Sequence, residues 1–327
     1  MPPARSQHNS AGQARLHYNR VMPEGLFQGI VPAIVTPFRS DERIDYHAWQ
    51  EIIEALIASG VDGLLCLGGQ GEFYALTEEE REVAARFATQ TADGRVSVYV
   101  NVGSNSTQES IRLAQQAESD GIDCAVVITP YYVQPSDDEL VDHYVSICHS
   151  VRIPVLAYNI PQRTRVTLTP AILARVAAIS ENFAGLKDSS GRIEDIEEYI
   201  AAGLGVLIGL DWLVLEGLKR GCTGVAVAGA NIVPRAFVDL YAAFRAGDLA
   251  RAQRMQALID PLQEAFALGS FSAMVKEALD IIGMSAGPCR RPVAHLPADA
   301  RAKLARILDA LGAEGYLLSV PANAAGR

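Results

Sequence analysis

The most informative segment of the sequence is Phe183-Ala184-Gly185-Leu186-Lys187-Asp188-Ser189-Ser190-Gly191. The apolar residues that precede the lysine are typical of a short buried strand. The four residues that follow it, 188–191, are typical of a turn between a strand and a helix. Lys187 is therefore expected where a strand ends. In a parallel α/β barrel this end of the strands carries the functional groups.

Segments typical of strands and of helices alternate along the chain on both sides of this stretch. The predicted strands are 29–38, 63–69, 97–103, 125–129, 154–159, 183–187, 206–210 and 224–228. The predicted helices are 46–59, 77–90, 107–119, 137–150, 170–180, 194–202, 211–220 and 234–246. The strands are apolar on both faces, as strands between two layers must be. This alternation predicts an α/β fold, a (β/α)8 TIM barrel, and no Gly-x-Gly-x-x-Gly sequence favours a doubly wound sheet instead.

Three further helices are predicted after the barrel, over 249–267, 272–282 and 298–311. We therefore expect a catalytic barrel over residues 26–246 and a C-terminal helical extension over 247–318. Residues 1–25 and 319–327 are expected to form flexible tails.

Composition and charge exclude several classes of protein. The net charge of −10 argues against a nucleic-acid surface, which needs clustered lysine and arginine. No apolar run is long enough to span a membrane, so no membrane partner is expected. The 5 cysteines are dispersed and odd in number, which indicates a reduced, cytoplasmic protein.

The ends of the predicted strands present residues suited to one kind of chemistry. The candidate substrate-binding and catalytic residues there are Thr36, Gly69, Gln70, Tyr132, Tyr158, Arg163, Lys187 and Ala226. The set has no histidine pair, no carboxylate pair and no metal-ligand spacing. We therefore predict no metal, and metal-dependent hydrolysis and glycoside hydrolysis fit poorly.

A desolvated lysine has a lowered pKa, and its neutral amine can form a Schiff base with a carbonyl substrate. A nearby phenol, such as that of Tyr158, can move protons without carrying charge at neutral pH. Arg163 can hold a carboxylate through its planar guanidinium, and backbone N–H groups of the turn at Gly69-Gln70 can hold another. The combination predicts a lyase that acts on a 2-oxo acid without a cofactor, through a covalent Schiff base on Lys187.

Each of these residues also has a purely structural interpretation. A lysine at a strand end can extend its amine to solvent, and a tyrosine in an apolar strand can be part of the core. Arg163 can be a solvated loop charge, and Tyr131-Tyr132 can be packing or a subunit contact. The functional interpretation is favoured because all of the candidates fall at one rim of one predicted barrel.

The chain resembles the dihydrodipicolinate synthase/N-acetylneuraminate lyase family of pyruvate-dependent class I aldolases over roughly residues 29–296. The motifs that carry the resemblance are Gly68-x-x-Gly71-Glu72, Thr129-Pro130-Tyr131-Tyr132, Tyr158-Asn159-Ile160-Pro161 and residues 185–191. The resemblance implies a Schiff base between Lys187 and pyruvate, and a proton shuttle through Tyr158. It also implies a homotetramer, a dimer of dimers, in which Tyr132 reaches into a neighbouring subunit's site.

Two motifs disagree about the second substrate. Arg163 matches the arginine of the synthase branch, which binds the carboxylate of aspartate semialdehyde. Gly69 and Gln70 stand where that branch has two threonines, one of which joins a proton relay. They look more like the branch that cleaves or dehydrates 2-keto-3-deoxy sugar acids. We place condensation of pyruvate with aspartate semialdehyde or a similar aldehyde first, the sugar-acid aldolase or dehydratase second, and a non-catalytic 2-oxo-acid binding protein third.

The feedback site for lysine in this family is matched only in part. Asn105, Glu109 and Tyr131 match it, but Phe73, Glu78 and Arg81 stand where smaller residues and histidines are expected. We therefore expect weak or absent inhibition by lysine.

Overall fold

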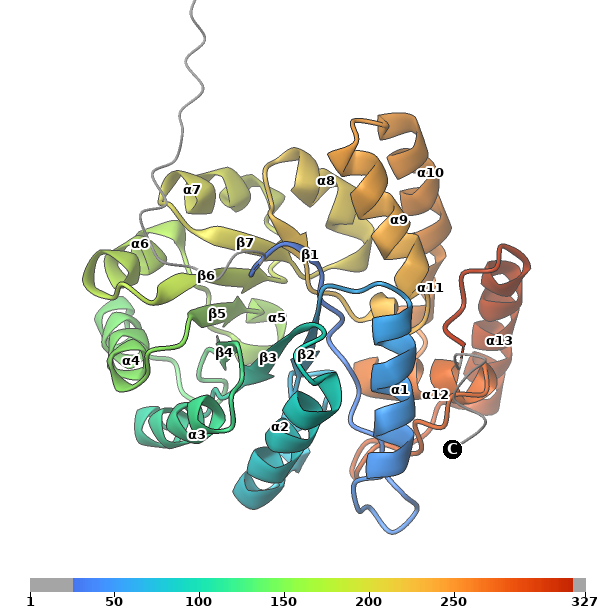
Figure 1. Cartoon of the computed structure of the whole chain (residues 1–327), viewed down its shortest axis with the longest axis horizontal. Coiled ribbons are helices and arrows are strands. Elements are labelled where there is room, and N and C mark those ends of the chain that lie inside the picture. Colours follow the sequence, from blue (N-terminus) through green and yellow to red (C-terminus); the bar gives the residue numbers. More distant parts are fainter. Residues whose placement is uncertain (1–25, 320–327) are drawn as a thin grey trace, which may run out of the picture.

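The computed structural model describes residues 26–319, and its eight strands form one parallel sheet (Figure 1). The strands are β1 (Gly29–Ile30), β2 (Gly63–Cys66), β3 (Ser97–Asn101), β4 (Cys124–Ile128), β5 (Val155–Asn159), β6 (Phe183–Asp188), β7 (Gly205–Ile208) and β8 (Gly224–Val225). Their order is β1-β8-β7-β6-β5-β4-β3-β2. The backbone beyond β1 then pairs with β2, since Ala33 and Leu65 form a parallel bridge. The sheet therefore closes on itself, which confirms the predicted (β/α)8 barrel.

Helices surround the sheet in Figure 1, as the alternation of the sequence predicts. Those of the barrel are α1 (Tyr46–Ala58), α2 (Glu78–Ala92), α3 (Thr107–Ser119), α4 (Asp137–Ser150), α5 (Pro161–Thr164), α6 (Pro170–Ile179), α7 (Ile196–Ala201), α8 (Val214–Lys219) and α9 (Pro234–Arg245). Two of them begin with a complete capping box, Thr77 with Glu80 in α2 and Ser136 with Glu139 in α4. These boxes satisfy backbone N–H groups that have no partner in the first helical turn.

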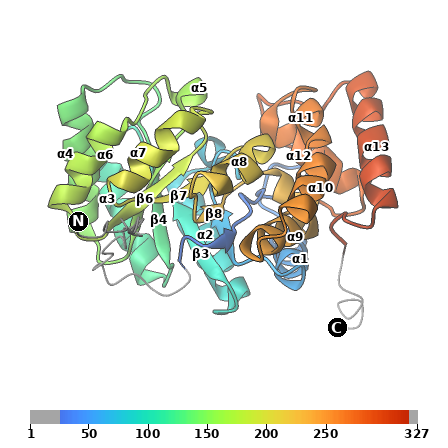
Figure 2. The ribbon, with the colours of Figure 1, turned by 90° about the horizontal axis from the view of Figure 1, so that it is seen from above.

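The C-terminal helices pack together at one side of the barrel, as Figure 2 shows for the segment coloured orange to red. They are α10 (Leu249–Ile259), α11 (Pro261–Phe266), α12 (Phe271–Ile281) and α13 (Ala298–Ala313). Gln256 of α10 joins them to the barrel, because its side-chain amide donates to the carbonyl oxygen of Asp211 at 3.1 Å. The predicted C-terminal helical extension is confirmed.

Several predicted boundaries are wrong for identifiable reasons. The helix predicted over 249–267 is broken at Pro261, which has no N–H to donate and begins α11 instead. The strand predicted over 29–38 is regular only in β1, because Pro32 interrupts the ladder. The short helix α5 was not predicted, although Pro161 at its first turn is a typical start signal.

A bulge in β6 sets the direction of Lys187. Val155 of β5 pairs with Phe183 but the next residue, Leu156, pairs with Gly185, so Ala184 is the extra residue. Phe183 packs against Tyr144 of α4 with ring centres 6.3 Å apart, on the helix side of the sheet. In a regular strand, Lys187 would point to the same side as Phe183. The extra residue reverses the alternation and turns Lys187 toward the barrel interior.

The predicted N-terminal tail (1–25) and nearly all of the predicted C-terminal tail (319–327) lie outside the described residues. Between residues 26 and 319, no helix is both long and apolar enough to cross a membrane.

Candidate active site

Lys187 lies buried at the carboxyl end of β6, beside Tyr158 at the end of β5. The two residues pair in the parallel register, and Nζ of Lys187 is 4.5 Å from the centre of the Tyr158 ring. Only 4% of the Lys187 surface is exposed. Burial disfavours the ammonium form and lowers the pKa of Lys187 to about 8, against an opposing effect of the Asp211 carboxylate. A fraction of the amine is therefore neutral near physiological pH and can act as a nucleophile.

Tyr158 keeps its phenolic proton in this environment. Burial raises the pKa of Tyr158 to about 12, while Ser189 and the positive charge of Arg163 lower it by less. A neutral phenol beside an amine can give a proton to a leaving oxygen and take it back. The structure thus brings the two predicted catalytic residues Lys187 and Tyr158 together.

Asp211 is a third titratable group of this site, and the sequence analysis did not assign it a role. It follows β7 and begins the 3-10 turn Asp211–Leu213, where its Oδ1 accepts a hydrogen bond from Gly229 N at 2.7 Å. Burial raises its pKa to about 7, and the charge of Lys187 counteracts part of this rise. An acid directly after a predicted strand is a signal that the sequence does offer.

A second layer of polar contacts fixes the ends of β5 and β6. Asn159 Nδ2 donates to Asp188 Oδ1 and the Ser190 hydroxyl donates to Asp188 Oδ2, each at 2.9 Å. Asn159 Oδ1 in turn accepts from the Leu168 backbone N–H at 3.1 Å. Since Asn159 and Asp188 follow Tyr158 and Lys187 directly in sequence, these bonds help to fix the positions of Tyr158 and Lys187.

The loop over residues 67–73 carries the candidates Gly69 and Gln70. The Thr36 hydroxyl donates to the Gly71 carbonyl at 2.8 Å. This bond anchors the loop to the segment that follows β1. Gln70 is 1% exposed, and its amide nitrogen lies 3.4 Å from the carbonyl oxygen of Phe271. Apart from Gly69 itself and its two neighbours in the chain, no described residue has an atom within 4 Å of a Cβ built on Gly69, so the position has room for a side chain.

Arg163 reaches the same wall of the site from α5. Its guanidinium carbon is 5.9 Å from the centre of the Phe271 ring, and its charge acts on the Tyr158 hydroxyl. Phe271, at the start of α12, is thus contacted by both Gln70 and Arg163. Sequence reasoning missed Phe271 because its contacts join residues about 100 to 200 positions apart, which no local pattern indicates.

The structure does not bring Tyr132 to Lys187 within one chain. The Tyr132 side chain is 89% exposed, and its backbone N–H donates to Asn105 Oδ1 at 3.3 Å. Ala226 is completely buried, and its N–H donates to the Ile208 carbonyl at 2.8 Å. Ala226 therefore extends the pairing of β8 with β7.

The functional groups gathered at this site suit proton transfer and covalent chemistry. Among the described residues, no group of three or more histidine, cysteine, aspartate or glutamate side chains is arranged to hold a metal ion. A buried amine with a lowered pKa, a neutral phenol and an exposed guanidinium at one barrel rim can bind, attack and protonate a carbonyl compound that carries a carboxylate.

Comparison with known proteins gives a consistent result. The model of the dihydrodipicolinate synthetase family matches residues 26–311. A 4-hydroxy-tetrahydrodipicolinate synthase of Methanoculleus marisnigri is 38% identical over 289 residues, which is 86% of this chain and 99% of the relative. The solved structure of YagE, a prophage protein of E. coli K12 in complex with pyruvate, has a TM-score of 0.85 and 34% identity, covering 88% of this chain and 99% of that one. A dihydrodipicolinate synthase from Acinetobacter baumannii, complexed with pyruvate, has a TM-score of 0.84 and 30% identity, covering 88% of this chain and 99% of that one.

We expect Asp211→Asn to move the titration of Lys187 to lower pH. The carboxylate raises the pKa of Lys187, and the asparagine amide oxygen can still accept from Gly229 N. The measurement is the rate of reductive methylation of Lys187 by formaldehyde and cyanoborohydride, followed by peptide mass spectrometry as a function of pH. Because the pKa of Asp211 is itself about 7, the two proteins should differ above pH 7 and converge below it.

Asp195→Asn is the matched control, since Asp195 is also acidic but pairs with Arg192, with its Oδ2 2.7 Å from Nε. It should leave the Lys187 profile unchanged. An Asp211→Asn profile that coincides with the wild-type one would contradict the role given to Asp211.

Proposed function

The chain belongs to the dihydrodipicolinate synthetase family, and we propose that it is a Schiff-base-forming pyruvate lyase or synthase of the class I aldolase type. The reaction that we place first is the condensation of pyruvate with aspartate semialdehyde or a similar aldehyde. The observation that carries the proposal is the buried Lys187, with a pKa of about 8, in register with the protonated Tyr158. The pyruvate complexes of the two similar structures support the choice of 2-oxo acid.

The reaction begins when the neutral amine of Lys187 attacks C2 of pyruvate. A carbon–nitrogen bond forms, the former carbonyl oxygen takes protons and leaves as water, and an iminium remains. Loss of a proton from C3 gives an enamine, whose C3 attacks the aldehyde carbon of the second substrate. Tyr158 donates and recovers protons in these steps, and its raised pKa returns it to the protonated form after each transfer. The aldehyde oxygen takes up a proton as the carbon–carbon bond forms, and an iminium on Lys187 results. Water then attacks C2 of this iminium, the carbon–nitrogen bond breaks and the Lys187 amine is freed, so no separate cofactor takes part.

The two carboxylates of the substrates are held by different groups. Backbone N–H groups at Gly69 and Gln70 hold the pyruvate carboxylate, and Thr36 fixes their loop through Gly71. Arg163 holds the carboxylate of the aldehyde substrate, with its guanidinium plane supported by Phe271. Ala226 contributes to the apolar wall.

Borohydride reduction in the presence of pyruvate tests this function. We expect a stable pyruvate adduct on the peptide that contains Lys187, because borohydride reduces an iminium to an amine that no longer hydrolyses. The other buried lysine, Lys276, is an internal control, since its Nζ pairs with Glu72 Oε1 at 2.6 Å. Its peptide should stay unmodified. Absence of an adduct on Lys187 would exclude both the synthase and the aldolase, and would leave the non-catalytic 2-oxo-acid binding protein.

A second candidate is the aldolase or dehydratase of 2-keto-3-deoxy sugar acids. It is favoured by Gly69, which offers no hydroxyl at the position where the synthase branch has a relay threonine. The space around the Gly69 Cβ position is open to residues other than its two neighbours in the chain, so a side chain could be accommodated there.

A substrate panel on the wild type and two variants decides between these reactions. We expect faster condensation with aspartate semialdehyde than pyruvate release from keto-deoxy acids. Gly69→Thr should raise the condensation rate by about tenfold or more, since a positioned proton-transfer group contributes about 10² or more. Gly69→Val, which has the same shape without the hydroxyl, is the control and should not raise it. A wild type that releases pyruvate faster than it condenses would reverse the order of the two candidates.

We also propose that the protein is a homotetramer, as the resemblance implies. Tyr131, Tyr132 and Val133 form a run of exposed apolar side chains at the end of β4. A run of this kind is suited to burial against a second copy. In that assembly the Tyr132 hydroxyl would join the site of the neighbouring subunit.

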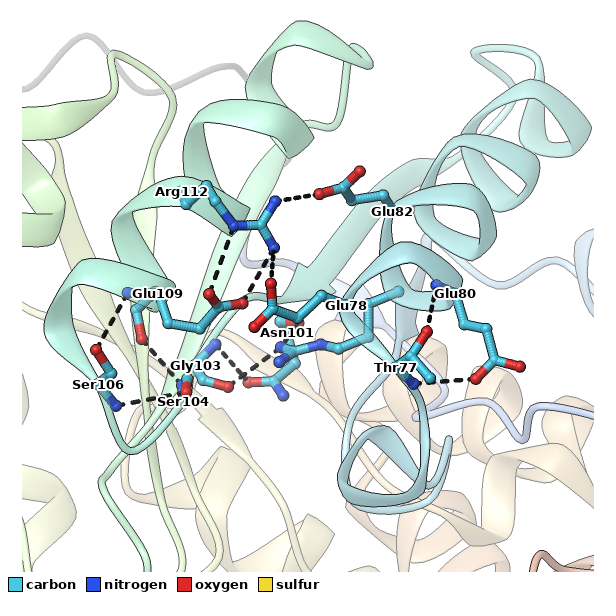
Figure 3. Close-up of polar contacts among 12 residues, drawn as sticks. Thr77, Glu78, Glu80, Glu82, Asn101, Gly103, Ser104, Ser106, Glu109 and Arg112 are labelled. Carbon is cyan, nitrogen blue, oxygen red and sulfur yellow. Dashed lines mark hydrogen bonds and ion pairs between the residues drawn. The ribbon is translucent and has the colours of Figure 1, made fainter.

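In the region that matches the family's lysine site, the glutamate side chains already form ion pairs with an arginine of this chain. Arg112 pairs with Glu82, with Glu78 at 2.7 Å and with Glu109 at 3.2 Å, as Figure 3 shows. Arg81 is buried beside them and donates to the carbonyl oxygens of Asn101 and Gly103. A ligand ammonium would have to compete with Arg112 for Glu109 and approach the charge of Arg81.

We therefore expect lysine to leave the activity essentially unchanged in the micromolar range. The measurement is a lysine titration of the pyruvate-dependent activity, with arginine as a control for non-specific ionic effects. Inhibition at micromolar lysine would contradict this prediction.

A further inference from the structure

The loop over residues 67–73 is held from outside the barrel by the first turn of α12. The Ser272 hydroxyl lies 3.3 Å from the Gly69 carbonyl oxygen and 3.5 Å from the Tyr74 hydroxyl. The Gln70 amide donates to the Phe271 carbonyl at 3.4 Å. The C-terminal extension therefore touches the loop at both of the residues assigned to the pyruvate carboxylate.

One helical turn further along, α12 holds the same loop through a buried ion pair. Nζ of Lys276 lies 2.6 Å from Oε1 of Glu72, and the two side chains are 2% and 0% exposed. Lys276 also donates to the Pro288 carbonyl at 3.0 Å and lies 4.1 Å from the centre of the Phe38 ring. The other oxygen of Glu72 accepts from the Arg290 N–H at 3.0 Å. Each of the two charged groups is thus paired with the other and hydrogen-bonded to one backbone group.

An ion pair buried to this degree adds little to the free energy of unfolding. Desolvation of the two charges offsets most of their attraction, and apolar side chains of similar size often serve folding as well. In some proteins such a pair instead fixes the conformation of the backbone that carries it. Here that backbone is left-handed at Glu72, with φ of 54°, two residues after Gln70.

We infer that Ser272 and Lys276, on one face of α12, are positioning residues for the carboxylate-binding loop. Ser272 holds the Gly69 carbonyl, and Lys276 holds Glu72, so the N–H groups between them face the 2-oxo acid. Thr36 holds the loop through a third point, the Gly71 carbonyl. This inference rests on the proposed function, because it assigns the loop to the pyruvate carboxylate. It gives the C-terminal extension a part in substrate binding.

The double variant Glu72→Gln/Lys276→Met tests the inference, since it removes both charges and leaves neither unpaired. We expect the pyruvate concentration for half-maximal borohydride trapping of Lys187 to rise about tenfold, which corresponds to about 1.4 kcal/mol. The extent of trapping at saturating pyruvate should not change, because Lys187 itself is untouched.

The control is Glu277→Gln on the same helix. Glu277 is also buried and bonded, with its carboxylate oxygens 2.7 Å from His295 Nδ1 and 2.8 Å from Arg301 Nε, and it makes no hydrogen bond to the loop among the described residues. It should lower the Tm without changing the half-saturating pyruvate concentration. A double variant that behaves like this control would overturn the inference.

Ser272→Ala extends the test to a variant that keeps every charge. We expect a rise of about threefold in half-saturating pyruvate, within the range of a lost neutral hydrogen bond, and recovery in Ser272→Thr. If the double variant does not fold and Ser272→Ala binds pyruvate as the wild type does, the inference is wrong. A wild type that gives no Lys187 adduct would instead overturn the proposed function, and the inference with it.

Discussion

The bulge at Ala184 in β6 is the constraint on which the site depends. It requires a residue without a Cβ at position 185, because a Cβ there would lie 2.0 Å from the Gly205 carbonyl oxygen, at a φ of 150°. The strand can then shift its alternation by one residue, with Phe183 toward the helices and Lys187 toward the interior. A regular strand of the same composition would place the amine between sheet and helices, where it could meet no substrate. The Gly-Leu-Lys sequence is therefore a geometric requirement as well as a motif.

Burial then gives each titratable group of the site its chemical character. It lowers the pKa of Lys187 to about 8, and it raises the pKa of Tyr158 to about 12 and that of Asp211 to about 7. One physical cause thus produces a nucleophilic amine and a neutral phenol side by side, since desolvation always disfavours the charged form. Asp211 limits the effect on Lys187, because its own charge partly restores the ammonium form. The hydrogen bond from Gly229 keeps that carboxylate in place and favours its ionised form.

The parts of this structure that the sequence predicts are those specified by local patterns. The bounds of α3 and α4 coincide with the predicted 107–119 and 137–150, because each helix begins at a serine cap followed by an acid. The positions of Lys187 and Tyr158 at the carboxyl ends of two strands are also predicted, because each lies at or beside the last residue of an apolar run. The contacts of α12 could not be predicted, because they join Gly69 and Gln70 to Phe271 and Ser272 across about 200 residues. Asp211 and the break at Pro261 do carry local signals, an acid directly after a predicted strand and a proline within a predicted helix.

The two sequence motifs that disagree about the second substrate meet on the same residue. Gln70 contacts the backbone of Phe271, and Arg163 lies over its ring, so the loop after β2 and helix α5 share one support from the C-terminal extension. A guanidinium supported on an aromatic face keeps its N–H groups directed along its edge, where they can bind a carboxylate in two-point fashion. That geometry recognises the carboxylate and is indifferent to whether the carbon chain beside it carries hydroxyl groups. Under the proposed function, discrimination between an aldehyde acid and a sugar acid would therefore fall to the loop at Gly69, where a hydroxyl would change which proton transfers the protein can assist.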